Sequence, residues 1–400
     1  MKIWHFSETA YPYLPPASEY ESVRVDLPNR YYDPKKGAEL FDRFIEEWQV
    51  AEEGGLEIML NEHHQTPTCV DPAGPLLLAA LARVTKTARL LILGNPVANR
   101  RQPVRVAEEM AFADILSHGR VEVGFVRGVP YEISPANANP VYTNERQWEA
   151  LDLILKAWTS HDGPFSHEGR FFHARRVNIW PRPYQEPHPP IWVSSTSPDG
   201  AARVGARGFI QATFLTGYAA TRPIFDGYRR GWRDARRSPD VPIDRLAYAA
   251  FVFTADSEAR ARAGAQELLW HIAINKIPPH FSNPPGYASI EANARALRAG
   301  ISRYPKATSV DAAIELGIMF AGTPDQVLSQ FGRFYDHVGG FGHLLVAGQS
   351  GFLSHAETVH GIKMLAREVF PKLRERYPDT AISGEIGHKA ASAQSTAIPI

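Results

Sequence analysis

Several features that would classify a protein at once are missing from this chain of 400 residues. Its single cysteine, Cys69, excludes an intrachain disulfide and favours a reducing compartment. Lysine plus arginine equals aspartate plus glutamate, at 43 each, so no net charge attracts nucleic acid or an anionic membrane. No apolar run reaches the ~18 residues of a membrane span, and no secretory signal opens the chain. We expect a soluble, cytoplasmic protein with neither nucleic-acid nor membrane partners.

Simple catalytic motifs are missing too. The chain has neither the Gly-x-Ser-x-Gly nor the His-Glu-x-x-His pattern, which removes the two simplest hydrolase interpretations. Residues 124–128 follow a strand-like stretch but lack the three-glycine spacing of a dinucleotide site. Glu62 does not complete a ligand set around its neighbouring histidines, so no metal site is expected.

What the chain does contain is a regular alternation of strand-like and helix-like stretches. The strands are expected at residues 3–6, 57–60, 90–93, 121–125, 191–193, 209–214, 245–254 and 343–346, with amphipathic helices between them. Such alternation builds a parallel sheet, and eight strands fit a closed ring. We predict an α/β fold, a (β/α)8 TIM barrel. An open doubly wound sheet is the alternative, because periodicity alone does not separate the two.

Longer segments interrupt the alternation. Residues 9–37, rich in proline, tyrosine and aspartate, predict a long loop, and residues 165–190 predict a small hairpin. Prolines at 278, 279, 284 and 285 predict an insertion over about 276–310, late in the barrel. The barrel is expected over residues 1–375, and the small, polar tail 376–400 is expected to be disordered.

Polar residues follow the expected strands and would meet at one edge of the barrel. They are Ser7, Asn61, Glu62, His63, His64, Asn95, Arg127 and the hydroxyl run Ser194 to Ser197. A run of hydroxyls at a helix start can bind phosphate through free backbone amides and the helix dipole. Arg127 and Arg146 could add charge-assisted bonds. Ordinary helix capping by Ser194 to Ser197, among them Ser195, Thr196 and Ser197, with Arg127 paired to a nearby carboxylate, explains the pattern equally well.

The adjacent histidines His63 and His64 carry the groups that titrate near neutral pH. Neighbours on a strand face opposite sides, so at most one of them points into the barrel mouth. The simplest interpretation is that one histidine is a hydrogen-bonded structural residue and the other faces a ligand.

Short segments in a fixed order connect the chain with a known family. They lie at residues 55–64, 83–87, 102–105, 117–120, 124–128, 144–146, 206–208 and 321–327. Together, over roughly residues 1–372, they resemble the bacterial luciferase-like flavin monooxygenases. No single segment is specific for this family, but the whole set of segments in this order is.

The resemblance implies a two-component monooxygenase. A separate flavin reductase would supply reduced FMN, which would react with O2 to form a C4a-(hydro)peroxyflavin that oxygenates a small organic substrate, apolar or ring-containing. It implies that Arg127, Arg146, Thr196, Ser197 and the Gly200 backbone bind the phosphate. His63 would be the catalytic histidine, with Asn95, and with Asn61 and Ser195 from the strand ends, around the flavin.

The family pattern also leaves questions open. Thr196 stands where luciferases have a glutamate, and Val126 stands where they have a cysteine near the flavin. An F420-dependent dehydrogenase on the same barrel and a flavin-binding protein without catalysis are alternatives. The resemblance favours a homodimer but gives neither the substrate, the site of oxygenation nor the reductase.

Overall fold

The computed structural model describes residues 1–236, 240–273, 277–290, 293–294, 307 and 309–378. Eight parallel strands form a closed ring in which each strand pairs with the next and the last pairs with the first. In order they are β1 (Lys2–Ser7), β2 (Glu57–Leu60), β3 (Leu90–Pro96), β4 (Val121–Val126), β7 (Ile191–Ser194), β8 (Ile210–Phe214), β9 (Leu246–Thr254) and β11 (His343–Gln349). This ring confirms the predicted (β/α)8 barrel and excludes the open sheet.

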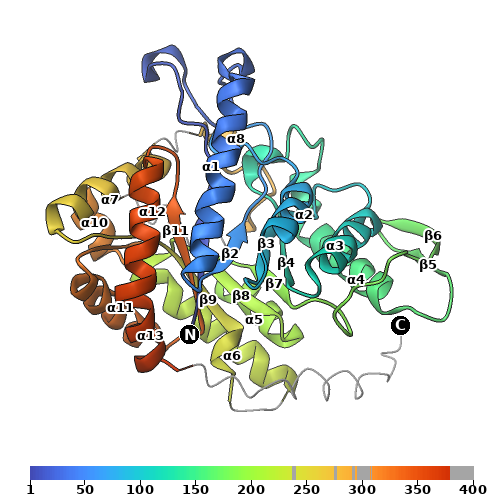
Figure 1. Cartoon of the computed structure of the whole chain (residues 1–400). Coiled ribbons are helices and arrows are strands. Elements are labelled where there is room, and N and C mark those ends of the chain that lie inside the picture. Colours follow the sequence, from blue (N-terminus) through green and yellow to red (C-terminus); the bar gives the residue numbers. More distant parts are fainter. Residues whose placement is uncertain (237–239, 274–276, 291–292, 295–306, 308, 379–400) are drawn as a thin grey trace.

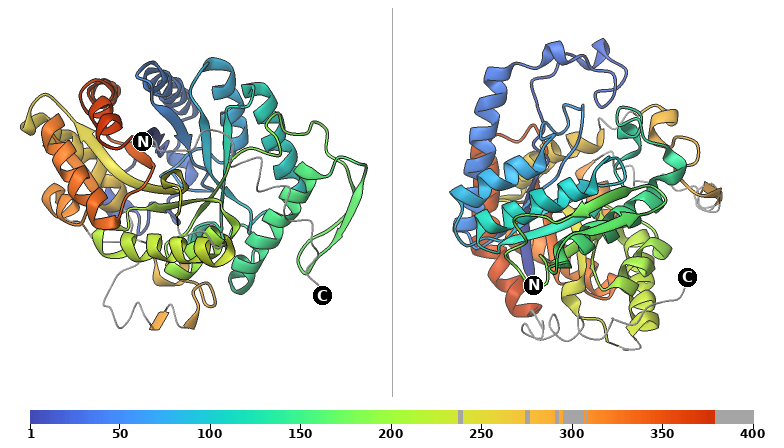
Figure 2. Two further views of the ribbon diagram at one scale, coloured as in Figure 1. Left: turned by 90° about the horizontal axis from the view of Figure 1, so that it is seen from below. Right: turned by 90° about the vertical axis from the view of Figure 1, so that its right-hand side faces the viewer.

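Helices surround the ring, as the view from below in Figure 2 shows. They are α1 (Pro34–Glu53), α2 (Gly74–Val84), α3 (Pro103–Ser117), α4 (Thr143–Thr159), α5 (Pro198–Arg207), α6 (Gly217–Arg236), α7 (Glu258–Ala273), α8 (Pro279–Ser282), α10 (Val310–Glu315), α11 (Pro324–Val338), α12 (His355–Met364), the π-helical turn η6 (Leu365–Val369) and α13 (Phe370–Arg376). No helix among the described residues is long and apolar enough to cross a membrane.

The strands alternate between two apolar cores, as residues with a period of two must. Trp4, Met59 and Trp192 fill the interior of the ring, where the two tryptophan rings meet edge to face at 5.4 Å. Ile3 and Ile58, one position away, join the larger core between the ring and the helices. Both faces of the sheet are therefore buried, which leaves the strand ends as the places for polar groups.

The hairpin predicted between residues 165 and 190 is confirmed, because β5 (Phe165–Glu168) and β6 (His173–Val177) pair antiparallel. One strand was not predicted: β10 (Met319–Gly322) adds to the second half of β9. The predicted long loop also ends earlier than expected, since α1 begins at Pro34 with Asp33 as its N-cap. Gly37 lies inside that helix, where a Cβ would stand 2.0 Å from the hydroxyl of Tyr32.

Parts of two other predictions fall outside the described residues. The expected insertion is described only at residues 277–290, 293–294, 307 and 309–310, which include α8, and the expected tail only to residue 378, just after α13. The long segment between β1 and α1 projects beyond the carboxyl ends of the strands, at the top of Figure 1. It contributes residues to the edge where the polar groups gather, which we call the barrel mouth.

Candidate functional site

The most developed feature of the barrel mouth is an acid–imidazole pair. His63 follows β2, and Glu132 lies in the 3-10 turn η3 (Pro130–Glu132) after β4. The Nδ1 of His63 lies 2.8 Å from Oε1 of Glu132, which also accepts the backbone N–H of His64 at 2.9 Å. The carboxylate therefore fixes the imidazole and leaves its Nε2, in a side chain that is 22% exposed, available at the mouth.

The two partners change each other's pKa. Burial alone would lower the pKa of His63, but the carboxylates of Glu132 and Glu8 outweigh it and raise that pKa. Burial alone would raise the pKa of Glu132, but His63 outweighs it and lowers that pKa. The pair therefore favours a protonated imidazole beside an ionised carboxylate, an arrangement that can hold or release a proton near neutral pH.

The neighbouring histidine, His64, contacts a different carboxylate. Its Nε2 lies 2.9 Å from Oε1 of Glu62, which also receives a hydrogen bond from Arg100. The second oxygen of Glu62 accepts the N–H of Gly74 at 3.1 Å, at the start of α2. His64 thus belongs to a structural network that ties the segment after β2 to α2, and the two histidines contact different carboxylates.

Asn61 is buried with both ends of its amide engaged. Its Nδ2 donates to Oε2 of Glu8 at 2.9 Å, and its Oδ1 faces the thiol of Cys69 at 3.5 Å. Burial raises the pKa of Glu8, while the charge of His63 opposes that rise. Asn61 therefore positions an acidic group beside His63, and the structure gives it no side-chain atom directed at a ligand.

Asn95 lies apart from the other candidates. It is completely buried, with Nδ2 donating to the carbonyl of Gly124 at 3.1 Å and lying 3.8 Å from the sulfur of Met110 in α3. Its side chain therefore lies between the ring and α3. The structure does not bring Asn95 to the mouth, although its buried Oδ1 has no partner among the described residues.

Arg127 and the hydroxyl run follow adjacent strands of the ring. Phe125 and Val193 are register partners on the adjacent strands β4 and β7, and Arg127 and Ser195 each stand two residues further on. The Arg127 guanidinium lies over the ring of Tyr287 at 3.6 Å and donates to its carbonyl at 3.0 Å. The described part of the expected insertion thus covers Arg127.

The hydroxyl run caps α5. Ser197 is the N-cap and accepts the N–H of Gly200 at 3.2 Å, while the Ser195 hydroxyl donates to the carbonyl of Ser197 at 3.3 Å. Thr196 is exposed beside them. A Cβ on Gly200 would lie 2.3 Å from the Ser195 hydroxyl oxygen, so the Ser195 side chain lies directly against this backbone. The capping hydrogen bonds are therefore present, and an anion at this site would accept hydrogen bonds from the same hydroxyl and backbone N–H groups.

The side chain of Arg146 makes structural contacts. Its Nε and Nη2 donate to the carbonyls of Ala98 and Arg100 at 3.0 and 3.1 Å, and the guanidinium lies over the ring of Phe172 at 4.6 Å. Burial lowers its pKa. Arg146 thereby holds the loop after β3 against α4, and the structure shows it as a positioning residue rather than as a free cation.

Sequence reasoning missed the partners that complete the mouth. Glu8, Arg24, Glu132 and His271 all lie near His63, and they come from the segment after β1, from η3 and from α7. Their types are unremarkable in the sequence, and only folding brings them together. Among the described residues, no group of three or more histidine, cysteine or acidic side chains has the arrangement of a metal site.

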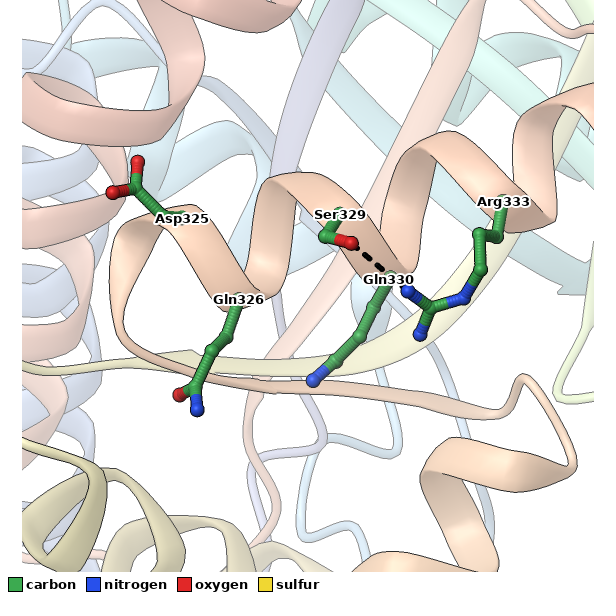
Figure 3. A pocket seen from close by; sticks show the side chains of 5 residues that line it. All are labelled: Asp325, Gln326, Ser329, Gln330 and Arg333. Atoms are coloured by element: carbon green, nitrogen blue, oxygen red, sulfur yellow. Dashed lines mark hydrogen bonds between the residues drawn. The ribbon is translucent and has the colours of Figure 1, made fainter.

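A shallow hollow on the outside of the barrel is separate from the barrel mouth. It runs along α11 and is lined by Asp325, Gln326, Ser329, Gln330 and Arg333, as Figure 3 shows. Gln330 is already bonded to the backbone of Ala321 at both amide atoms. All five side chains come from one helix, so this hollow is a surface feature and not part of the mouth.

Comparison with known proteins gives a consistent result. The model of the family described as luciferase-like monooxygenase matches residues 27–340. The oxygenase component of a flavin-dependent trigonelline monooxygenase from Acinetobacter baylyi is 30% identical over 60% of this chain and 66% of its own length, just under two thirds. An FMNH2-dependent dimethylsulfone monooxygenase from Pseudomonas putida is 26% identical over 82% of this chain and 86% of its own.

Solved structures share the fold. The oxygenating constituent of 3,6-diketocamphane monooxygenase from Pseudomonas putida, in complex with FMN, superposes with a TM-score of 0.71 at 21% identity, covering 93% of this chain and 98% of that one. An F420-dependent secondary alcohol dehydrogenase superposes with a TM-score of 0.65 at 18% identity, covering 92% and 98%. At such identities the likeness concerns the barrel alone.

Proposed function

The chain belongs to the luciferase-like monooxygenase family, and we propose that it is the oxygenase component of a two-component system that uses reduced FMN and O2 to oxygenate a small organic substrate. The observation that carries the proposal is the His63–Glu132 pair at the mouth of this family's barrel, on the same edge as Arg127 and the start of α5. The names of the trigonelline and dimethylsulfone relatives support the reaction class.

The residues at the mouth suit FMN. A phosphate needs a cation, hydroxyl donors and backbone N–H groups, which Arg127, Ser195, Thr196 and Ser197 offer together at the start of α5. The Ser195 hydroxyl lies directly against the Gly200 backbone, so a hydroxyl group and a backbone N–H group stand close enough to bind one anion together. Arg146 would support this site by holding the neighbouring loop, and Asn61 by holding Glu8.

The chemistry that reduced FMN supplies is the two-electron activation of O2, which places one oxygen atom in the substrate and releases the other as water. In our proposal, His63 holds a proton at Nε2 while Glu132 keeps its Nδ1 protonated and oriented. The segment between β1 and α1 excludes water, which would otherwise divert the reaction to peroxide.

Flavin binding and turnover test the proposal. Anaerobic titration with reduced FMN is expected to give saturable binding, and subsequent mixing with O2 and a panel that includes trigonelline and dimethyl sulfone is expected to give an oxygenated product. Binding without product over a wide panel would favour a non-catalytic flavin-binding protein. Reduction of F420 by an alcohol, without O2 uptake, would favour the dehydrogenase.

Two variants separate binding from chemistry. Arg127→Ala is expected to weaken FMN binding at least about tenfold, because a charge-assisted hydrogen bond is lost. Arg105→Ala, at an exposed position on α3, is the matched control. His63→Ala is expected to keep FMN binding and to release H2O2 in place of product. An unchanged FMN dissociation constant for Arg127→Ala would show that Arg127 does not bind the phosphate. Full coupling of flavin oxidation to product formation in His63→Ala would show that His63 is not the catalytic histidine.

We also infer that the protein is a cytoplasmic homodimer that receives FMNH2 from a separate reductase. Support for the dimer comes from the large apolar side chains exposed on adjacent helices, Leu76 on α2 and Phe112 on α3, at 73% and 53% exposure. Sedimentation velocity is expected to show a dimer that Phe112→Asp dissociates, and a monomeric wild-type protein would contradict this.

A further inference from the structure

A buried arginine at the barrel mouth has no role in the proposed flavin site. Arg24, in the segment between β1 and α1, is only 5% exposed. Its Nη1 donates to the hydroxyls of Thr68 at 2.7 Å and Tyr131 at 3.3 Å, and its Nη2 donates to Nε2 of His271 at 3.0 Å. All three contacts are to uncharged acceptors, since burial and the charge of Arg24 push the pKa of His271 well below its usual range.

The charge of Arg24 has no direct counterion. Within the described residues, no carboxylate oxygen lies within 4.0 Å of its guanidinium, whereas Arg43, Arg89 and Arg100 each have one. Glu8 interacts electrostatically with Arg24 but forms no ion pair with it, and its Oε1 lies 3.5 Å from Nε2 of His271. A buried cation without a partner is costly, and arginine cannot escape that cost by losing its proton.

The unused donors of Arg24 point to the missing partner. Its Nε is buried and makes no hydrogen bond to any described residue, and its Nη2 uses one of its two hydrogens. Nε and Nη2 form one edge of the planar guanidinium, and through such an edge arginine can bind a carboxylate with two parallel hydrogen bonds.

Arg24 also lies close to His63. The ring of Tyr131 is 5.8 Å from the Arg24 guanidinium and 6.4 Å from the His63 imidazole, so both groups neighbour the same aromatic side chain. The candidate phosphate donors, by contrast, follow β4 and β7. An anion held by Arg24 would therefore sit beside the proposed reaction centre and not at the flavin phosphate.

We propose that Arg24 binds a carboxylate of the substrate through its Nε and Nη2, and that the enzyme prefers organic acids to their neutral analogues. This inference rests on the proposed oxygenase function for its choice of substrate over another anion. It assigns a specificity-determining role to the segment between β1 and α1, which brings the arginine into the mouth.

Binding of matched acids and amides tests the assignment. Benzoate, cyclohexanecarboxylate and acetate are titrated calorimetrically against benzamide, cyclohexanecarboxamide and acetamide, with flavin-free and FMN-loaded protein. At least one acid is expected to bind wild-type protein at least about tenfold more tightly than its amide, as a charged hydrogen-bonded pair requires. Absence of an acid preference across all three pairs overturns the proposal.

Variants of Arg24 test whether this residue causes the preference for acids over amides. Arg24→Met is expected to abolish it, and Arg24→Lys, which keeps the charge but not the two-point geometry, is expected to reduce it several-fold; Arg105→Met is expected to leave it unchanged. If Arg24→Met does not fold, as judged by its melting temperature, Arg24→Lys decides the question. A preference that survives Arg24→Lys in full contradicts the assignment.

The same experiment separates this inference from the proposed function. Wild-type protein that binds reduced FMN and consumes O2 but shows no acid preference refutes only the role of Arg24. An acid preference that depends on Arg24 in protein that does not bind FMN supports the anion site and refutes the oxygenase.

Discussion

Asp71 offers the sharpest quantitative prediction, because its buried carboxyl group is poorly compensated. The residue lies beside the His63 backbone and is 4% exposed. Its Oδ1 accepts the N–H of Ala73 at 3.2 Å, while its Oδ2 is buried without a partner among the described residues. Burial, with repulsion from Glu62, raises the pKa of Asp71 from 3.8 to about 7.

The magnitude follows from linkage between protonation and folding. Because the folded state binds this proton more tightly than the unfolded state, stability falls as the pH rises from about 4 to about 7. At 1.36 kcal/mol per pKa unit, the rise from 3.8 to about 7 corresponds to at most about 4 kcal/mol. The variant Asp71→Asn cannot lose a proton, so it does not incur this loss.

Urea unfolding of both proteins at pH 5, 6, 7 and 8 measures the effect. The stability of Asp71→Asn relative to wild type is expected to rise with pH, by up to about 1 M in urea midpoint for a denaturant dependence of about 3 kcal/mol per M. Asp162→Asn, at an exposed position, is the control and is expected to show no such trend. A difference that is independent of pH, or that falls with pH, would refute the reasoning.

Further predictions concern other parts of the molecule. Glu132→Gln keeps the hydrogen bonds to His63 but removes the charge, so the pH profile of coupled oxygenation is expected to move to lower pH; an unmoved profile would contradict the pair. Gly200→Ala is expected to weaken FMN binding about tenfold, the loss of roughly one hydrogen bond, in a fluorescence titration; an unchanged affinity would place the phosphate elsewhere. Glu122→Gln, which breaks a buried pair with Arg89 and weakens the bond from Trp192, is expected to lower the unfolding free energy by about 3 kcal/mol without changing FMN affinity.

The barrel was predictable because its signal is local and repeated. Ring strands such as β2, β9 and β11 are largely apolar with both faces buried, so they stand out in the sequence. The strand β10 was missed because Met319–Gly322 is only four residues long and leads directly into the helix cap at Thr323. A strand this short is recognisable only by its pairing with β9, which is a long-range contact.

The start of α1 shows how a local rule can mislead. The proline-, tyrosine- and aspartate-rich composition of residues 9–37 predicts a loop that extends to Gly37. In the structure Gly37 is buried inside the helix because the Tyr32 hydroxyl occupies the space that a side chain would need. Asp33 followed by Pro34 was the better signal, since an acidic cap and a proline in the first turn both favour a helix start.

For the candidate site, the sequence could predict only which residues follow the strands. The residues Asn61, His63, Arg127 and Ser195 were found because they follow strands, but their partners come from distant segments: Glu132 is 69 positions from His63, and His271 is 247 from Arg24. Periodicity carries no information about such pairs. Nor could the sequence show that Asn95 turns outward against α3, where Met110 packs on it.

The charges at the mouth, taken together, favour anions. The pKa of Glu132 is lowered, and its negative charge is matched by His63, whose pKa is raised. Burial raises the pKa of Asp71 to about 7, which weakens the negative charge that this group contributes near neutral pH. Arg24 cannot change its charge at all.

A positive excess therefore remains beside His63, in a place shielded from water where charge interactions are strong. A reduced flavin, which binds as an anion, and a carboxylate substrate would both lower the energy of this arrangement. Each would also raise the pKa of the imidazole further. Binding of one anion is then expected to keep His63 protonated for the step that follows, so a carboxylate that binds at Arg24 should shift the pH dependence of coupling upward, whereas its neutral amide should not.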